Sequence, residues 1–381
     1  MGCTLSAQPH YAQVLATLEQ NSPSLHLLQQ QREAQQAAVR AGSLVEDPEV
    51  EFAYLWRSPG DAQGNRWDLK VMQSFEMPSV YAHKNKIRQL QQVSADCSWR
   101  QQRQQLLFEA QQVCAALVYY NAYVDFYTQC ERSAQDLADL YQARLQNGDC
   151  GVLDYNRIQL QLAETQNKLN VAKVQRDAMA DNLALLNGGS LITFEQLDFE
   201  PLQLPADFDQ WIIEMEERSP QLHYLLNQVQ QSQQQLRLSR SQWLPKVALG
   251  YASEHTVPES FRGVALGLNI PLWSKARTVT HAKVELQSAQ LEHQNALLHY
   301  HNHLKSLFNK VKALDDNYKN LQQTLALYNS EELLAKALQA GEISLEYYLR
   351  SIEFYRDTKA SLLEVAYELE QAYLQLNADA L

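Results

Sequence analysis

Residues 18–28 read LEQNSPSLHLL, and residues 215–225 read MEERSPQLHYL, so the chain carries one motif twice. The copies keep a constant offset of 197 residues from this motif through the strand that follows it, as Pro23 and Pro220 show. Farther along the chain the offset becomes 193 residues. Because the correspondence covers nearly the whole chain, the sequence predicts one body built from two similar halves.

Each half shows the same predicted order of helix, strand, strand, long helix and helix. The assigned segments are 1–8 (leader or signal remnant), 9–187 (first repeat), 188–206 (linker), 207–377 (second repeat) and 378–381 (C-terminal tail). Leu5-Ser6-Ala7 resembles the small-residue end of a secretory signal, and the Gly-Cys pair before it could mark lipid attachment at Cys3. An unstructured leader is the alternative for these first residues.

The composition narrows the classes of function. A net charge of −12 over 381 residues disfavours a phosphate-binding surface, so nucleic acid is not expected as a partner. No run of about 18 apolar residues occurs, so no transmembrane helix is expected. The five cysteines lack the CxxC and Cys/His spacings of metal sites, and no nucleophile elbow, phosphate loop or HExxH motif is present. The sequence therefore predicts no enzyme activity and no cofactor.

Two Pro-led hairpins, at residues 48–77 and 245–270, carry the pattern that bears most on function. In the first, Val50 and Phe52 alternate with polar or small residues, which is typical of strands with one apolar and one polar face. The second hairpin alternates in the same way around a loop predicted at 254–262. The polar face is expected to carry Glu51, Asp68, Lys70 and Asn269.

Two hairpins give four strands, which are too few to close a barrel. Within lipid, an open sheet edge leaves backbone N–H and C=O groups without hydrogen bonds, which is very costly. If the hairpins enter a membrane, several chains must therefore share one barrel, with the polar face turned to a wet lumen. Tryptophans at the strand ends favour this interpretation because Trp collects at membrane interfaces, although strands of soluble proteins favour Trp as well. The tryptophans concerned are Trp56, Trp67, Trp243 and Trp273.

Long helices follow the hairpins. Unbroken helices are predicted at 79–146 and 273–339, each reaching roughly 100 Å at about 1.5 Å per residue. Shorter helices are predicted at 9–42, 153–187, 207–242 and 345–377, and a short strand around Leu191–Phe194. Val284, Leu291 and Leu298 repeat every seven residues, which is typical of a coiled-coil seam. The polar remainder indicates contact with water, so the wall of a water-filled tube and a solvated coiled coil both fit.

These features together resemble the TolC-type outer-membrane efflux channels over residues 9–377. The resemblance rests on the duplicated element order and on three stretches, LPKVALGY (244–251), GLNIPLW (267–273) and LQAGEIS (338–344). It implies a mainly α-helical homotrimer in the bacterial outer membrane, whose twelve-stranded β-barrel continues into a long α-helical barrel in the periplasm. It also implies a periplasmic adaptor and an inner-membrane pump as partners. The short chain without large insertions is similar to the branch paired with heavy-metal cation pumps.

In this family the periplasmic tips lie at the helix–helix turns, which here are residues 147–152 and 340–345. The first turn departs from the second, because Cys150 and Gly151 stand where the second has Ile343 and Ser344. The residues expected to form these turns and contact an adaptor are Gly148, Gly151, Gly341 and Ser344. Threefold repetition would turn acidic residues at the tips into carboxylate rings, which select cations. The gate candidates are Asp149, Asp154, Glu342 and Glu346, and the alternative is that these carboxylates only stabilise helix N-termini.

Other chemistry is weakly indicated. His299 and His303 share a helix face, but His301 does not, so a three-ligand metal site is not predicted. The sequence predicts a passive conduit that exports small molecules or cations. The competing hypothesis is a soluble or periplasmic coiled-coil scaffold that uses two β-hairpins to bind partners. A conduit would require detergent for extraction, whereas a scaffold would stay in the aqueous fraction.

Overall fold

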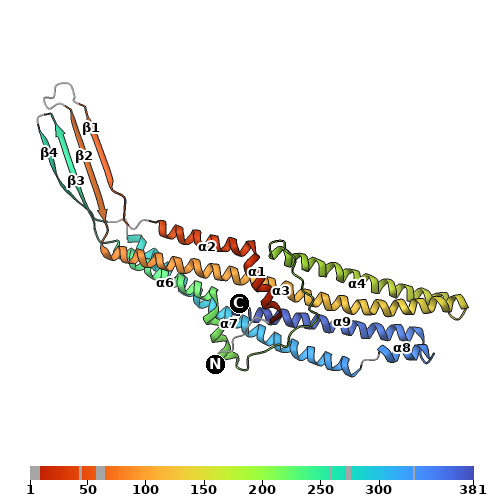
Figure 1. Ribbon diagram of the computed structural model, residues 1–381. Helices are drawn as coiled ribbons and strands as arrows, with labels where there is room; N and C mark the ends of the chain where they lie inside the picture. The colour runs from red at the N-terminus through yellow and green to blue at the C-terminus, as the bar shows by residue number, and fades with distance from the viewer. Residues whose placement is uncertain (1–8, 43–44, 57–64, 258, 272–275, 329–330) are drawn as a thin grey trace. The chain divides into compact units, whose positions relative to one another are not determined.

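The computed structural model describes residues 9–42, 45–56, 65–257, 259–271, 276–328 and 331–381. Figure 1 shows a chain that is mainly helical, with one small sheet. The helices are α1 (Pro9–Asn21), α2 (Pro23–Ala41), α3 (Pro78–Asn147), α4 (Val152–Leu186), α5 (Phe208–Arg218), α6 (Pro220–Ser241), α7 (Ala276–Leu327), α8 (Glu331–Gln339) and α9 (Leu345–Leu376). The strands are β1 (Glu49–Leu55), β2 (Arg66–Phe75), β3 (Lys246–Thr256) and β4 (Ser260–Asn269), and a 3-10 turn, η1, spans Ala378–Ala380. The leader at 1–8 lies outside the described residues.

The predicted first helix of each half is wrong in one respect, because each is two helices. Residues 9–42 divide at Ser22 into α1 and α2, and residues 207–242 divide at Ser219 into α5 and α6. The cause is the proline that follows each serine. A proline disfavours the helical conformation in the residue before it, but it is well placed at the first position of a new helix.

Two further predictions are corrected. The unbroken helix predicted over 273–339 is instead divided into α7, which ends at Leu327, and α8, which begins at Glu331. Glu331 and Glu332 place two acidic side chains in the first turn of α8, where they favour a helix start. No strand forms around Leu191–Phe194. The side-chain amide of Asn121 donates to the carbonyl oxygens of Phe194 and Gln196 instead, at 3.0 and 3.2 Å.

The four strands form one antiparallel sheet in the order β1-β2-β3-β4. The second hairpin loop is shorter than predicted, since β3 continues to Thr256 and β4 begins at Ser260. Strands β1 and β4 each pair on one side only, so among the described residues their outer edges have no strand partner. Directly opposed residues share a face of the sheet, and the register therefore defines two faces across all four strands.

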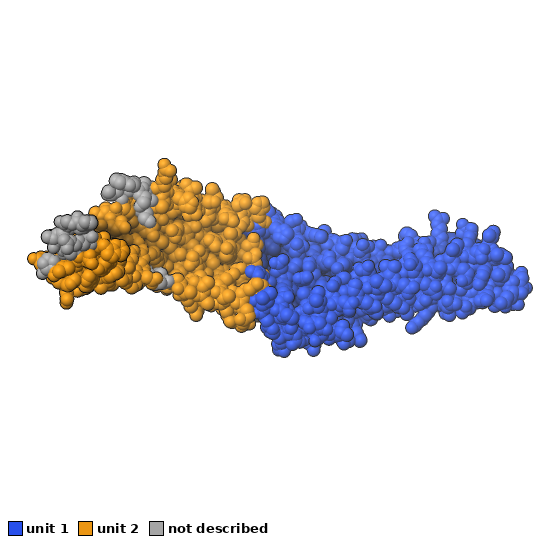
Figure 2. Space-filling model, turned by 90° about the horizontal axis from the view of Figure 1, so that it is seen from above, with its two compact units in different colours: residues 1–27, 102–218, 300–381 blue, residues 28–101, 219–299 orange. Residues whose placement is uncertain are grey.

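The chain contains two compact units, coloured separately in Figure 2. One unit comprises residues 1–27, 102–218 and 300–381, and the other comprises residues 28–101 and 219–299 and contains the sheet. In the first unit, one buried cluster joins α5, α7 and α9 around Met215 and Val311. A second joins α3, α4, α8 and α9 around Tyr141, Ile158 and Ile352.

Within the described chain, no helix combines the length and the apolar content that a bilayer span requires.

Candidate functional site

One face of the sheet is apolar and exposed. The register aligns Val50, Val71, Tyr251 and Val264 across the four strands. Val264 and Leu266 each expose 76% of their surface, and Phe52 exposes 63%. The register also places Ser253 and Arg262 on this face, in the row of Phe52 and Leu69. A soluble monomer rarely exposes so many large apolar side chains on one sheet face, so this face is the first part of the candidate site.

The opposite face carries charged and small residues together with Phe261. The register aligns Glu51, Lys70, Ala252 and Gly263 in one row, and Ala53, Asp68, Glu254 and Phe261 in the next. The Arg66 guanidinium joins this face, with ion pairs of 3.0 Å to Asp68 and 3.2 Å to Glu254. Asn269 lies opposite Lys246 at the other end of the hairpin. All four residues predicted for the polar face therefore lie on one face, and their role in a lumen stays a prediction.

The tryptophans lie near opposite ends of the strands. Trp56 follows β1 and Trp67 lies near the start of β2, so both are at the loop end of the first hairpin. Trp67 lies 5.3 Å from the ring of His255 between ring centres. Trp243 lies just before β3, at the other end, and is exposed. Trp273 lies outside the described residues, and the interfacial belt remains a prediction.

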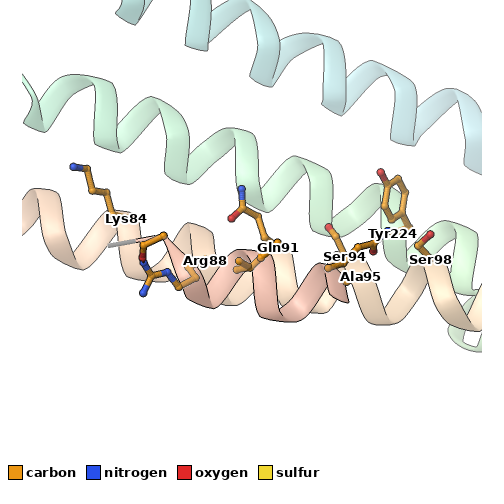
Figure 3. A pocket seen from close by; sticks show the side chains of 11 residues that line it. Lys84, Arg88, Gln91, Ser94, Ala95, Ser98 and Tyr224 are labelled. Atoms are coloured by element: carbon orange, nitrogen blue, oxygen red, sulfur yellow. The ribbon is translucent and has the colours of Figure 1, made fainter. Parts of the chain in front are cut away.

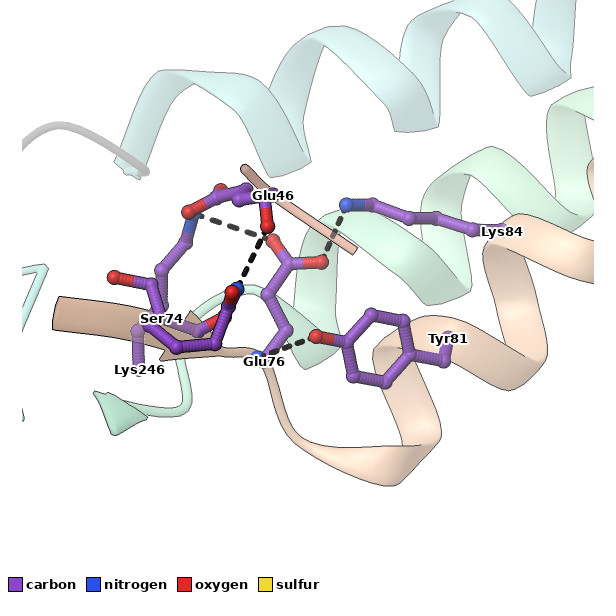
Figure 4. A network of polar contacts seen from close by, with 7 residues as sticks. Glu46, Ser74, Glu76, Tyr81, Lys84 and Lys246 are labelled. Atoms are coloured by element: carbon purple, nitrogen blue, oxygen red, sulfur yellow. Dashed lines mark hydrogen bonds and ion pairs between the residues drawn. The ribbon is translucent and has the colours of Figure 1, made fainter. Parts of the chain in front are cut away.

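A charged network at the base of the sheet was not anticipated from the sequence (Figure 4). The carboxylate of Glu76, which follows β2, accepts from Lys84 on α3 and lies 3.4 Å from Lys246 at the start of β3. Lys246 also pairs with Glu46, which precedes β1. The backbone N–H of Glu76 donates to the Tyr81 hydroxyl at 2.9 Å. The network ties three strand ends to α3, and only the register could have shown that these residues meet.

The two helix–helix turns share one backbone arrangement. Gly148 and Gly341 have φ of +80° and +73°, in the left-handed region that favours glycine. In the first turn, the N–H groups of Gly148 and Asp149 bond carbonyls three and five residues back, at 3.1 and 2.8 Å. The corresponding distances from Gly341 and Glu342 in the second turn are 3.2 and 2.9 Å. These bonds satisfy carbonyls that a helix end otherwise leaves unpaired.

The structure brings both turns to one hydrophobic cluster. Cys150 and Ile343 are partly buried against the same group of side chains, so these two corresponding positions of the turns have the same packing role. The next position differs between the turns, because Ser344 caps the following helix with its side chain and Gly151 has no side chain to do so. The Ser344 hydroxyl accepts from the N–H of Tyr347 at 3.2 Å and caps α9, whereas Gly151 provides no side-chain cap for α4.

The acidic candidates lie in or just after these turns. Asp149 and Glu342 are exposed, and Asp154 is half-buried in the first turn of α4. Glu346 is exposed in the first turn of α9, and its carboxylate lies 3.8 Å from the Arg157 guanidinium on α4. Their position permits a helix-terminal role and a gating role alike, so gating stays a prediction.

The structure does not bring the histidine candidates, His299 and His303, into a metal-binding arrangement among the described residues. His299 and His303 are exposed on α7, and His301 pairs with Glu216. Among the described residues, no group of three or more His, Cys, Asp or Glu side chains is placed to hold a metal ion.

A groove of about 770 Å³ lies along α2, α3 and α6, and sequence reasoning missed it (Figure 3). Its lining is mixed, because polar side chains such as Gln91 and Ser94 alternate with apolar ones such as Val39. The two basic side chains at one end are already engaged, since Lys84 pairs with Glu76 and Arg88 donates to the Gly42 carbonyl. Among the residues that the structure describes, both basic side chains of the groove already have partners, so the groove gives no evidence of an anion site.

No protein-family model and no curated protein sequence matches the chain. Solved structures do match its fold. The outer membrane channel CmeC of Campylobacter jejuni aligns with a TM-score of 0.78 at 16% identity, covering 98% of this chain and 85% of that one. A membrane protein from Pseudomonas aeruginosa gives 0.81 at 14% identity, covering 98% and 90%. The outer membrane protein VceC of Vibrio cholerae gives 0.76 at 13% identity, covering 97% and 94%.

These alignments span 97–98% of this chain and 85–94% of the others, so they include the sheet and the helical hairpins together. At such low identity the likeness concerns the fold. The chain therefore has the fold of the TolC-type outer-membrane efflux channels that its sequence resembles.

Proposed function

We propose that this chain is the outer-membrane channel component of a tripartite efflux system. Three copies would form a passive conduit that carries small molecules or cations out of the periplasm. A periplasmic adaptor would contact the helix–helix turns, and an inner-membrane pump would supply the energy. The observation that supports this most is the four-stranded sheet, which has one exposed apolar face, one charged face and two open edges.

The sheet has the properties that lipid demands of a shared barrel. Its apolar face suits acyl chains, and its charged and small residues suit a water-filled lumen. Strands β1 and β4 run in opposite directions within the sheet, so β4 of one copy can pair antiparallel with β1 of the next. Closing the ring through three copies would give twelve strands and satisfy every edge.

The helical turns would form the periplasmic end of the conduit. Three copies would place the carboxylates of Asp149, Asp154, Glu342 and Glu346 in rings, which attract cations and respond to divalent ions. Metal cations are one candidate cargo, since the short chain is similar to the heavy-metal branch of the family. The conduit itself performs no chemistry on its cargo, and no cofactor is required.

A pair of adjacent substitutions on β4 tests the membrane assignment. Val264→Lys places a charge on the apolar face, at a cost of about 2–4 kcal/mol near the bilayer midplane. Ala265→Lys places the same charge on the opposite face, beside a lumen that tolerates it. We expect Val264→Lys to remove trimers from the outer-membrane fraction, and Ala265→Lys to leave them in place.

Fractionation and native gel electrophoresis after detergent extraction would measure both results. Wild-type protein that stays in the aqueous fraction as a monomer would contradict the proposal and support the coiled-coil scaffold. Equal tolerance of both lysines in the membrane-bound trimer would contradict the assignment of the two faces.

A further inference from the structure

A pocket of about 560 Å³ lies among α7, α8 and α9, within one compact unit. This volume is within the range of small-molecule sites, which is roughly 300–1,000 Å³. Helix α9 contributes most of the lining, and the end of α7 and part of α8 contribute the rest. The described residues that line the pocket are Thr324, Leu325, Tyr328, Leu334, Tyr347, Arg350, Ser351, Phe354, Tyr355 and Thr358.

The lining includes several aromatic side chains that are exposed to solvent. Phe354 exposes 76% of its surface, Tyr328 72% and Tyr347 59%. Tyr355 also lines the pocket and is half-buried. Aromatic rings around a concave surface can stack on a flat apolar ligand, and removing their area from water favours the complex. The lining therefore suits a ligand with an aromatic body.

Arg350 stands between two of these aromatic residues on α9. It follows Tyr347 by three positions and precedes Phe354 by four, so the three side chains share one face of the helix. Arg350 is exposed, and no carboxylate among the described residues forms an ion pair with it. Glu346, one turn before it, pairs with Arg157 instead, at 3.8 Å. Among the described residues that line the pocket, Arg350 alone is charged.

The threonine hydroxyls of the pocket already donate to their own helices. Thr324 donates to the carbonyl of Asn320 and Thr358 to the carbonyl of Phe354, each at 2.8 Å. The Arg350 guanidinium therefore supplies the strongest donors that a ligand can reach. A guanidinium is planar and binds a carboxylate or a sulfonate through two parallel N–H groups. The charge in the pocket thus favours an anion.

We propose that this pocket binds a small aromatic anion. The aromatic body lies against Tyr328, Tyr347 and Phe354, and its carboxylate or sulfonate accepts from Arg350. Such a ligand covers the exposed rings and neutralises a cation that no described carboxylate pairs with. This inference goes beyond the proposed function, because the described lining residues belong to one copy and the site requires neither a trimer nor a membrane.

Photolabelling of the full-length protein tests the site. The probe is 4-benzoylbenzoate, a benzophenone with one carboxylate, and 4-methylbenzophenone is its neutral counterpart. After illumination of the detergent-solubilised protein, proteolysis and mass spectrometry locate the adducts. We expect saturable labelling by the carboxylate probe within residues 347–358, and much weaker labelling by the neutral probe. An excess of 2-naphthoate should compete, whereas decanoate, which has a carboxylate but no ring, should compete poorly.

Substitutions separate the charge from the aromatic surface. Arg350→Gln should raise the half-saturating concentration of the carboxylate probe about fivefold, the size expected for an exposed ion pair, and leave the neutral probe unchanged. Phe354→Ala should weaken labelling by both probes. Arg132→Gln is the matched control for charge, because Arg132 is an exposed arginine of α3 outside the pocket. Leu160→Ala, which truncates an exposed apolar side chain of α4, is the control for the aromatic surface.

Three outcomes would overturn the site. They are equal labelling by the two probes, labelling in Arg350→Gln as strong as in Arg132→Gln, and competition by decanoate equal to that by 2-naphthoate. Labelling of dissociated monomers but not of trimers would show that a second copy covers the pocket, and it would overturn the proposal as well. Any of these results leaves the channel assignment standing. Conversely, a wild-type aqueous monomer that gives the expected labelling would contradict the channel and retain the site.

Discussion

At the scale of single residues, Ser344 and Gly151 occupy the same position in the two turns, but only Ser344 caps its helix. Ser344→Ala leaves the N–H of Tyr347 without its side-chain acceptor, at a cost of about 1 kcal/mol. We expect amide exchange at Tyr347 to become roughly fivefold faster in the detergent-solubilised protein, measured by hydrogen exchange. Ser344→Gly should cost only a few tenths of a kcal/mol, and equal effects from both substitutions would contradict a capping role.

Cys114 and Cys150 differ in accessibility, and this difference is directly measurable. Cys114 is fully buried, and burial raises the pKa of its thiol to about 12. At pH 8 a maleimide should therefore label the partly exposed Cys150 quickly and leave Cys114 unmodified until the protein unfolds. Labelling of Cys114 in the folded protein at the rate of Cys150 would contradict this packing.

The raised pKa of Cys114 also makes the free energy of unfolding depend on pH. An exposed thiol has a pKa of about 8.5, so as the pH rises the unfolded chain loses this proton before the folded chain does. The stability contributed by the buried neutral thiol is complete below that pH and declines as the pH rises toward about 12.

The sequence predicted which residues form the turns, but not which of their side chains cap a helix and which pack into the hydrophobic cluster. Gly148 and Gly341 were recognisable because a helix that stops in a polar turn needs a residue at positive φ. The equivalence of Cys150 and Ile343 in one hydrophobic cluster was not, because the first copy of the motif replaces a large apolar residue by a small thiol. Cys150 and Ile343 thus differ in residue type, but both contact the same hydrophobic cluster.

At the scale of elements, the turn that follows α8 depends on Gly341. A Cβ added there would meet open space, so the cost of Gly341→Ala comes from the backbone alone. With φ at +73°, that cost is about 1–2 kcal/mol. Hydrogen exchange at Glu342, whose N–H bonds the carbonyl of Ala337, should report a corresponding fall in protection. Gly151→Ala is the control because its φ of −81° suits alanine, and an equal loss there would contradict the argument.

The elements themselves were largely predictable, and their exceptions have local causes. The strands were identified by alternation and the long helices by their unbroken polar and apolar periodicity. The breaks at Ser22 and Ser219 were missed because apolar residues continue the helical spacing on both sides of the proline. The strand expected at Leu191–Phe194 was a fair reading of local propensity, but a side chain of α3, Asn121, satisfies that backbone instead. The pairing of β2 with β3 joins residues far apart in the sequence, and no local signal sets their register.

At the scale of the whole molecule, the acidic turns allow a prediction about the proposed conduit. Glu342→Gln combined with Asp149→Asn removes two exposed carboxylates from each chain at the turns. We expect single-channel conductance in a planar bilayer to rise and block by divalent cations to weaken, because neutral turns no longer bind the cations that would hold them together. Glu332→Gln on α8, an exposed carboxylate away from the turn, is the control. Unchanged conductance in the double variant would contradict a gating role.

The open edges of the sheet have a consequence for biogenesis. In the proposed assembly, each newly made protomer offers two strand edges that have no strand partner among the described residues, beside an apolar surface, until β1 and β4 find neighbours. Either edge can pair with the wrong chain in the meantime. Correct assembly therefore requires that protomers pair with one another before they pair with other chains, and the rate of encounter determines which happens first. High-level overproduction, which crowds unfinished protomers together, should therefore yield insoluble cross-β deposits out of proportion to the extra synthesis.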